Sequence, residues 1–255
     1  MNWSEVKAVV TGGASGLGFA VVERINKAGG QVAIFDHDIE TAEEKAFSAG
    51  DGVIALDVDI CNEQSVLDAV KEAKDYHGNI NLLVNCAGIL ETAKVVGSTR
   101  VMPLVDFEKT IAVNLIGSFL VCREVAASMR DNYAGVDDER GVIINTASIA
   151  AYEGQVGQVA YSASKGAIAS MTLPLAREME SYNIRVMCIA PGVFDTSMMS
   201  DVPDEIKYSI MDQSLYPHRM GDPSEFSALV QHVYENSMLN GSVIRLDGGL
   251  RMSAK

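Results

Sequence analysis

Two residues that could move a proton, Tyr161 and Lys165, stand four positions apart in the chain. At this spacing two helical side chains project from one face. A tyrosine hydroxyl ordinarily titrates near pH 10, which is too high for a base at neutral pH. A neighbouring ammonium group stabilises the phenolate and lowers this pKa. The pair therefore predicts a general base that takes the proton of an alcohol as the alcohol becomes a ketone.

Two further polar residues fit the same chemistry. Ser148 directly follows an apolar run, where its hydroxyl is placed to hydrogen-bond the substrate oxygen and orient the reacting C–H bond. Asn114 lies in a helical pattern and could hold a water that links Lys165 to solvent. Each residue alone has an ordinary explanation, because serines often follow strands and helical asparagines are often only solvated. Together with Tyr161, in this order, they predict the catalytic set of a secondary-alcohol dehydrogenase.

A glycine-rich segment near the N-terminus predicts a dinucleotide site. It runs Thr11-Gly12-Gly13-Ala14-Ser15-Gly16-Leu17-Gly18 between a strand-like run and a helical one. Gly12 permits a tight turn, Gly16 lets the backbone approach a pyrophosphate, and Gly18 lets the helix pack closely. The free N–H groups of the first helical turn would face the phosphates. A simple turn is the alternative. The residues assigned to the cofactor here are Gly12, Ser15, Gly16, Leu17 and Gly18.

Asp36, which follows the second strand-like run, indicates which dinucleotide is bound. A carboxylate there can accept hydrogen bonds from the adenine-ribose hydroxyls, and it repels the 2′-phosphate of NADP. Neither Ala14 nor His37 is an arginine or lysine that could offset this repulsion. We therefore predict NAD, although an exposed strand-end aspartate would leave the preference open. Residues after the third and fourth runs are also assigned to the cofactor: Asp57, Val58, Asn85, Ala87 and Gly88.

Alternating strand-like and helical stretches must position these residues. The strand-like runs, rich in Val and Ile, are Ala8–Thr11, Val32–Phe35, Val53–Leu56, Leu82–Asn85, Val142–Thr146, Arg185–Ile189 and Val243–Leu246. Helical periodicity marks Leu17–Lys27, Glu63–Tyr76, Asp106–Arg130, Tyr161–Ser181 and Pro223–Glu235. Unalternated strands are typical of a sheet buried on both faces. The pattern predicts one α/β domain over residues 1–255, a Rossmann-type doubly wound parallel sheet of about seven strands with helices on both faces.

Three segments interrupt the alternation: Ile89–Val105, the polar stretch Asn132–Arg140, and Phe194–Gly221. Ligands bind at the carboxyl ends of parallel strands, where loops of this length lie. We therefore expect loops near 89–105 and 194–221 to form substrate walls, with inert surface insertions as the alternative.

Composition limits partners and compartment. The net charge of −14 argues against nucleic acid and anionic membranes as partners. The apolar runs are expected to be too short for a membrane span, which needs roughly 20 residues. The histidines show no ligand spacing, so no metal is predicted. The four cysteines, which form no C-x-x-C pair, are predicted to be buried free thiols: Cys61, Cys86, Cys122 and Cys188. An apolar run from Ala8 leaves no room for a signal peptide, so a cytoplasmic location is expected.

With these residues in place, the chain resembles the short-chain dehydrogenase/reductase family over its whole length. The resemblance rests on Thr11–Gly18, Asn85-Cys86-Ala87-Gly88, Asn114, Ser148, Tyr161, Lys165 and Pro191-Gly192. It implies Asn114, Ser148, Tyr161 and Lys165 as catalytic residues, with Tyr161 and Lys165 also contacting the cofactor. It further implies that Pro191, Gly192, Val193 and Thr196 lie against the nicotinamide carboxamide.

Longer strings are similar to the type II 3-hydroxyacyl-CoA dehydrogenases, a subgroup of that family. They include Glu153-Gly154-Gln155-Val156-Gly157-Gln158, Tyr161–Gly166 and Arg245-Leu246-Asp247-Gly248-Gly249. The resemblance implies oxidation of a (3S)-3-hydroxyacyl-CoA, short or 2-methyl-branched, in fatty acid and branched-chain amino acid catabolism. The implied substrate-binding residues are Ser148, Gln155, Gln158 and Tyr161. It also implies a homotetramer, for which small residues at Ala163, Ala167 and Ser170 would permit close helix contact.

Two other functions remain open. One is an NAD-linked alcohol or hydroxysteroid dehydrogenase acting on a CoA-free substrate. The other is a structural subunit that needs no catalysis, against which the intact catalytic set argues. The basic residues that could meet the phosphates of CoA are few: Lys94, Arg100, Lys207, His218 and Arg219.

Overall fold

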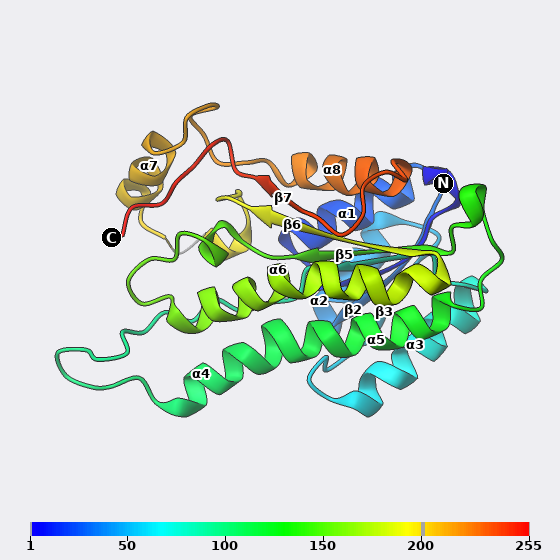
Figure 1. Ribbon diagram of the computed structural model, residues 1–255, viewed down its shortest axis with the longest axis horizontal. Coiled ribbons are helices and arrows are strands. Elements are labelled where there is room, and N and C mark those ends of the chain that lie inside the picture. The colour runs from blue at the N-terminus through cyan, green and yellow to red at the C-terminus, as the bar shows by residue number, and fades with distance from the viewer. Residues whose placement is uncertain (1, 200–201, 255) are drawn as a thin grey trace.

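A parallel β-sheet forms the centre of the computed structural model, which describes residues 2–199 and 202–254 (Figure 1). Its strands lie in the order β3-β2-β1-β4-β5-β6-β7. They are β1 (Lys7–Thr11), β2 (Gln31–Asp36), β3 (Val53–Asp57), β4 (Leu82–Asn85), β5 (Gly141–Thr146), β6 (Ile184–Pro191) and β7 (Val243–Leu246). All strand predictions are confirmed, with ends that shift by at most two residues. The order reverses between β1 and β4, and this is the place where a doubly wound sheet binds its ligand.

Helices cover both faces of the sheet. They are α1 (Gly16–Lys27), α2 (Ile39–Ala49), α3 (Glu63–His77), α4 (Leu104–Ile111), α5 (Ser118–Met129), α6 (Val159–Met179), α7 (Asp204–Asp212) and α8 (Pro223–Glu235). Helices α1, α2 and α8 share one hydrophobic cluster with the sheet, and α3, α5 and α6 share the other. The predicted fold class is therefore confirmed.

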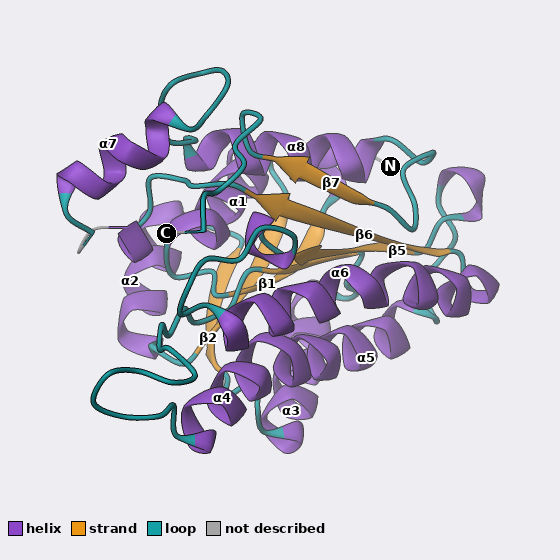
Figure 2. Ribbon diagram, turned by 60° about the vertical axis from the view of Figure 1, so that its left-hand side comes forward, coloured by secondary structure: helices purple, strands orange, loops and turns teal. Residues whose placement is uncertain are grey.

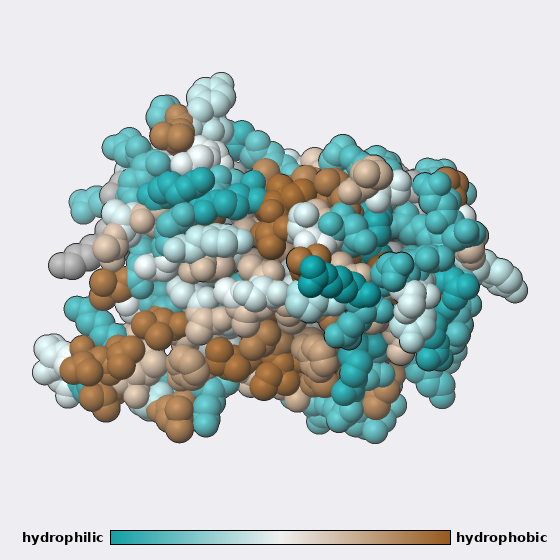
Figure 3. Space-filling view, viewed as in Figure 1, coloured by the Kyte–Doolittle hydropathy of each residue, from teal (hydrophilic) through white to brown (hydrophobic). Residues whose placement is uncertain are grey.

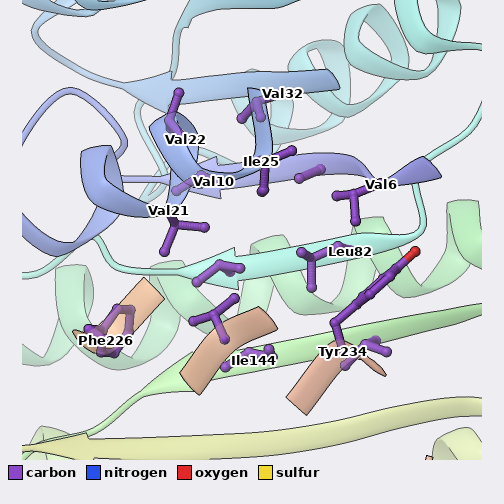
Figure 4. Close-up of a cluster of buried hydrophobic side chains, with 14 of the residues drawn as sticks. Val6, Val10, Val21, Val22, Ile25, Val32, Leu82, Ile144, Phe226 and Tyr234 are labelled. Carbon is purple, nitrogen blue, oxygen red and sulfur yellow. The ribbon is translucent and has the colours of Figure 1, made fainter. Parts of the chain in front are cut away.

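Neighbouring residues of each strand supply the two clusters in turn. Val10 and Leu82 face α1 and α8 in the cluster drawn in Figure 4, whereas Val9 and Leu83 face α3 and α5. All four side chains are fully buried. Because both faces are covered, a strand of this sheet has no polar face, which explains the unalternated runs in the sequence.

The helix predicted over Asp106–Arg130 is continuous in space but not regular. It comprises α4, a π-helical turn at Ala112–Gly117, and α5. The stretch Leu104–Met129 is long and apolar enough to cross a membrane by length and composition, so the expectation that the apolar runs are too short was wrong here. In this fold 44% of its most apolar window is buried, and α5 packs against α3, β4 and β5. A helix packed into the core of a protein can meet the same criteria of length and composition.

Several other expectations need correction. Helix α2 was not predicted, and α7 lies inside the stretch expected to be a loop at 194–221. In the polar stretch 132–140, Glu139 is buried and forms an ion pair with Arg185 of β6. Cys61 is exposed and Cys86 only half-buried, whereas the other two cysteines are buried as predicted. The neighbours of a residue in the sequence therefore did not predict reliably whether its side chain is buried.

Candidate active site

The predicted catalytic residues meet at the carboxyl edge of the sheet, beside the point where the strand order reverses. Ser148 follows β5, Tyr161 and Lys165 lie in the first two turns of α6, and Asn114 lies in the π-helical turn. In Figure 1 this edge faces left, together with α7 and the loop before α4. Three separate elements, β5, α6 and the π-helical turn, thus bring the catalytic set to one place.

Tyr161 and Ser148 are joined by a side-chain hydrogen bond. Burial raises the pKa of the Tyr161 hydroxyl, and the bond with Ser148 opposes this rise. We expected the ammonium of Lys165 to lower this pKa. In the free protein the net shift of this pKa is upward, because the loss of hydration of a phenolate outweighs the hydrogen bond with Ser148, and the stabilisation by Lys165 stays a prediction. Tyr161 is therefore protonated at neutral pH in the free protein.

Lys165 is held between the end of β5 and the ring of Tyr161. Its Nζ donates a hydrogen bond of 2.8 Å to the carbonyl oxygen of Thr146, and it lies 5.8 Å from the centroid of the Tyr161 ring. Burial lowers the pKa of Lys165 from its ordinary 10.5 to about 8. The ammonium is thus charged at neutral pH, but its charge is poorly stabilised. A lysine in this state is typical of functional sites.

Asn114 joins three parts of the site. Its Oδ1 accepts from the N–H of Ile89 at 2.8 Å, and its Nδ2 donates to the carbonyl of Ile89 and the hydroxyl of Ser164. The side chain is fully buried. It therefore ties the chain after β4 to α6, a positioning role that the sequence did not reveal. The predicted water relay stays a prediction. π-Helical turns often mark functional sites, and here the turn carries Asn114.

The glycine-rich turn has the shape that a pyrophosphate requires. Gly12 has a φ of +63°, and a Cβ there would lie 2.8 Å from the backbone nitrogen of Ala87. At Gly18 a Cβ would lie 2.2 Å from the carbonyl oxygen of Gly12, so only glycine lets α1 pack this closely. Ser15 precedes α1 without a side-chain hydrogen bond to its first turn. The N–H groups of that turn are thus available to an anion, and the cradle fits a dinucleotide.

Asp36 lies beside this turn, at the end of β2. Its Oδ2 accepts from the N–H of Ala14 at 3.2 Å, and its Oδ1 accepts from the N–H of Asp38 at the same distance. The exposed ring of His37 lies 3.2 Å from Oδ1. The backbone therefore fixes the carboxylate next to the glycine-rich turn, where an adenine ribose would lie.

The remaining predicted cofactor residues lie at or just after the ends of β3, β4 and β6. Backbone of Ala87 and Gly88 lines the site: Ala87 N–H donates to the Thr11 hydroxyl, and a Cβ on Gly88 would lie 3.5 Å from Lys165 Nζ. Thr196 lies against Gly16, which brings the segment after β6 over the glycine-rich turn. Asp57 is exposed at the end of β3, Val58 is buried, and the chain from Pro191 through Gly192 to Val193 leaves β6 at this same edge.

Asn85 has a different surrounding from the one its assignment implies. Its side chain is buried between β4 and β5, where Nδ2 donates to Asn145 at 2.9 Å and Oδ1 accepts from Thr11. The side chain thus links strands rather than facing the glycine-rich turn.

The predicted substrate residues Gln155 and Gln158 lie in the loop between Ser148 and α6. The backbone N–H of Gln155 donates to the side chain of Gln158, and Nε2 of Gln155 donates to the carbonyl of Ser253. Both side chains therefore help to shape the loop. Of the basic residues considered for CoA, Arg219 is held by two hydrogen bonds of 2.8 Å to Glu225, whereas Lys94 and Arg100 are exposed on the loop before α4.

The chain is similar to known proteins over most of its length. Residues 6–207 match the family model described as short chain dehydrogenase. The chain is 44% identical to 3-hydroxyacyl-CoA dehydrogenase type-2 of Drosophila melanogaster, over 96% of this chain and 97% of the relative. It is 45% identical to the Homo sapiens protein of that name, over 96% and 95%.

Two solved structures have the same fold as this chain. That of 3-hydroxyacyl-CoA dehydrogenase type-2 from Mycobacterium avium superposes with a TM-score of 0.93 at 36% identity, covering 97% of this chain and 96% of that one. That of 3-ketoacyl-(acyl-carrier-protein) reductase from Brucella melitensis, complexed with NADH, gives 0.85 at 28% identity, covering 97% and 98%. With its catalytic residues gathered beside a dinucleotide cradle, the chain belongs to the short-chain dehydrogenase family.

Proposed function

We propose that the protein oxidises a (3S)-3-hydroxyacyl-CoA, short or 2-methyl-branched, to the 3-ketoacyl-CoA with NAD. The observation that carries this proposal is the hydrogen bond between Tyr161 and Ser148 beside Lys165 and the dinucleotide cradle. The names of the relatives support the substrate class.

The residues of the chain divide the work of alcohol oxidation. Ser148 holds the substrate oxygen, and the deprotonated oxygen of Tyr161 takes the hydroxyl proton. Lys165 stabilises that phenolate, while Thr146 holds the ammonium in place. The nicotinamide ring, when bound, supplies the acceptor for the hydride. The cradle at Gly12–Gly18 and the carboxylate of Asp36 would hold the cofactor.

The substrate assignment is tested by NAD reduction, followed by NADH absorbance with purified protein. The panel consists of 3-hydroxybutyryl-CoA, its 2-methyl analogue, free 3-hydroxybutyrate and a hydroxysteroid. Selective turnover of the two thioesters supports the proposal. Turnover of the CoA-free alcohols alone would overturn the substrate class and leave the chemistry at Tyr161 standing.

The direction of the reaction should depend on pH. Because burial raises the pKa of Tyr161, oxidation needs a phenolate that is scarce at neutral pH. We expect the rate of oxidation to rise as pH increases above neutrality, and reduction, which needs the protonated hydroxyl, to favour lower pH. Initial rates in both directions across a pH series check this. Equal pH profiles in the two directions would contradict it.

The preference for NAD should depend on Asp36. We expect Asp36→Ser to lower the ratio of kcat/KM for NAD to that for NADP by about a hundredfold, because the repulsion of the 2′-phosphate and the ribose contacts are both lost. Asp51→Asn, which removes the same charge from an exposed turn, is the matched control. An unchanged ratio in Asp36→Ser would show that other groups set the preference.

A homotetramer is also proposed. Figure 3 shows apolar side chains gathered over α4 to α6, where Ile116, Phe119 and Leu173 are 43% to 49% exposed. Small residues Ala163 and Ser170 are exposed on α6, which permits close approach of a second helix. Light scattering at micromolar concentration should give a tetramer mass. A monomer mass would contradict the proposal.

A further inference from the structure

The segment after β7 runs along the carboxyl edge of the sheet and touches separate walls of the site. We call residues 247–254 the C-terminal strap. The carbonyl of Gly248 accepts from the N–H groups of Leu215 and Tyr216, both at 3.1 Å. Farther along, the N–H of Ser253 donates to the side chain of Gln213 at 2.9 Å. The strap thus holds the chain that follows α7.

The other side of the strap holds the loop between Ser148 and α6. The carbonyl of Ala254 accepts from the N–H of Val156 at 3.1 Å, and the carbonyl of Ser253 accepts from Gln155 at the same distance. That loop in turn holds the segment before α4, because Gly157 accepts from the N–H of Ala93 at 2.9 Å. Segments that are distant in sequence are therefore linked in series around the mouth of the site.

A partly buried ion cluster fixes the strap to this loop. Arg245 donates two parallel hydrogen bonds of 2.8 Å to Glu153 and one of 2.7 Å to Asp247. Arg251 donates to Asp247 at 3.1 Å, and the guanidinium of Arg245 also lies 5.2 Å from the centroid of the Tyr152 ring. The hydrogen bonds from Arg245 hold the pKa of Glu153 below its usual range. Bidentate pairs of this kind fix orientation as well as distance.

The position of Glu153 gives the cluster a consequence for catalysis. It lies in the short loop that leaves Ser148 and enters α6 at Val159, immediately before Tyr161. Arg245, one residue before the end of β7, pairs with Ala190 of β6, so the sheet holds its backbone. A loop anchored to it keeps the substrate side of the Ser148–Tyr161 pair in one arrangement. Within residues 2–199 and 202–254, no hydrogen bond or ion pair joins this cluster to the glycine-rich turn or to Asp36, whereas Gly192, assigned to the nicotinamide end, lies against Asp247.

We propose that Glu153 is a positioning residue, which together with Arg245 and the C-terminal strap sets the shape of the alcohol-binding wall without contributing to the dinucleotide cradle. The proposal rests on the proposed function only in that Tyr161 oxidises some secondary alcohol. It is tested with whichever alcohol the unmodified protein turns over, so failure of the acyl-CoA assignment remains distinguishable.

The test is Glu153→Gln, which keeps the shape of the side chain and removes its charge. We expect KM for the alcohol to rise about tenfold, the effect of losing a charge-assisted bidentate contact, while kcat changes less and the Kd for NAD stays within about twofold. Arg245→Lys keeps the charge but loses the parallel hydrogen bonds, so it should raise the same KM. Glu23→Gln, from an exposed pair with Lys27, is the control.

Deletion of residues 253–255 tests the strap separately. It removes the hydrogen bonds to Gln155 and Val156 and should raise KM for the alcohol in the same direction. Thermal unfolding measured alongside shows that each variant is folded at the assay temperature. Unchanged alcohol KM in folded Glu153→Gln would overturn the proposal. A parallel loss of NAD affinity would overturn it as well, because general loosening of the fold would then explain the result.

Discussion

Tyr161→Phe is expected to lower kcat/KM for the alcohol about a thousandfold while leaving the Kd for NAD nearly unchanged. The substitution removes one hydroxyl and keeps the ring against which Lys165 lies at 5.8 Å. The lost group is the one that takes the substrate proton, so the effect falls on kcat. Steady-state kinetics and NAD binding by fluorescence measure the two quantities independently.

The stability of the same variant separates a chemical effect from a structural one. Tyr161 hydrogen-bonds Ser148, and burial already makes its ionisation unfavourable, so a phenyl ring should be tolerated with a change of about 1 kcal/mol or less in the free energy of unfolding. Tyr133→Phe, at a fully exposed tyrosine, is the matched control and should change neither quantity. Near-normal turnover by Tyr161→Phe would assign the proton transfer to another group.

The strands could be predicted from the sequence because each is a short apolar run that must be buried on both faces. Helix α2 lacked this signal, since its buried residues are only Ala42 and Ala46. Its ends did carry one: Asp38 caps the first turn through Thr41, and Gly50 follows the last residue with a φ of +109°. Capping residues would have found the helix where hydrophobic periodicity could not.

The catalytic set was predictable because residue type and chain order are sufficient to identify it. The partners of buried polar atoms were not, because they depend on register and packing. Asn85 faces Asn145 only because β4 and β5 pair in that register. The direction of the pKa shift of Tyr161 likewise depends on how far the ring is buried. In the sequence, Glu153 was only part of a segment that resembles the type II 3-hydroxyacyl-CoA dehydrogenases. Its contact with Arg245 depends on the fold.

Lys165 places a free-energy cost on the folded state that depends on pH. Its pKa falls from 10.5 to about 8 on burial. Below pH 8 the lysine is charged in both states, and the folded protein bears the whole cost. Between these values the unfolded chain binds more protons, so stability rises with pH, and above 10.5 the cost is gone. At 1.36 kcal/mol per pKa unit, the cost at neutral pH is about 3 kcal/mol.

Lys165→Met should therefore make the protein more stable and nearly inactive at once. We expect a gain of roughly 2 kcal/mol at pH 7, because losing the hydrogen bond to Thr146 offsets about 1 kcal/mol of the relief. Turnover should fall by roughly 10²- to 10⁴-fold, since the phenolate of Tyr161 loses its stabilising charge. Urea unfolding at pH 7 and near pH 10 measures the difference from the unmodified protein, which should shrink at the higher pH. Lys27→Met, at an exposed lysine, should show no such difference. A less stable Lys165→Met at pH 7 would mean that the contacts of the ammonium outweigh its lost hydration, and that this lysine contributes to folding as well as to catalysis.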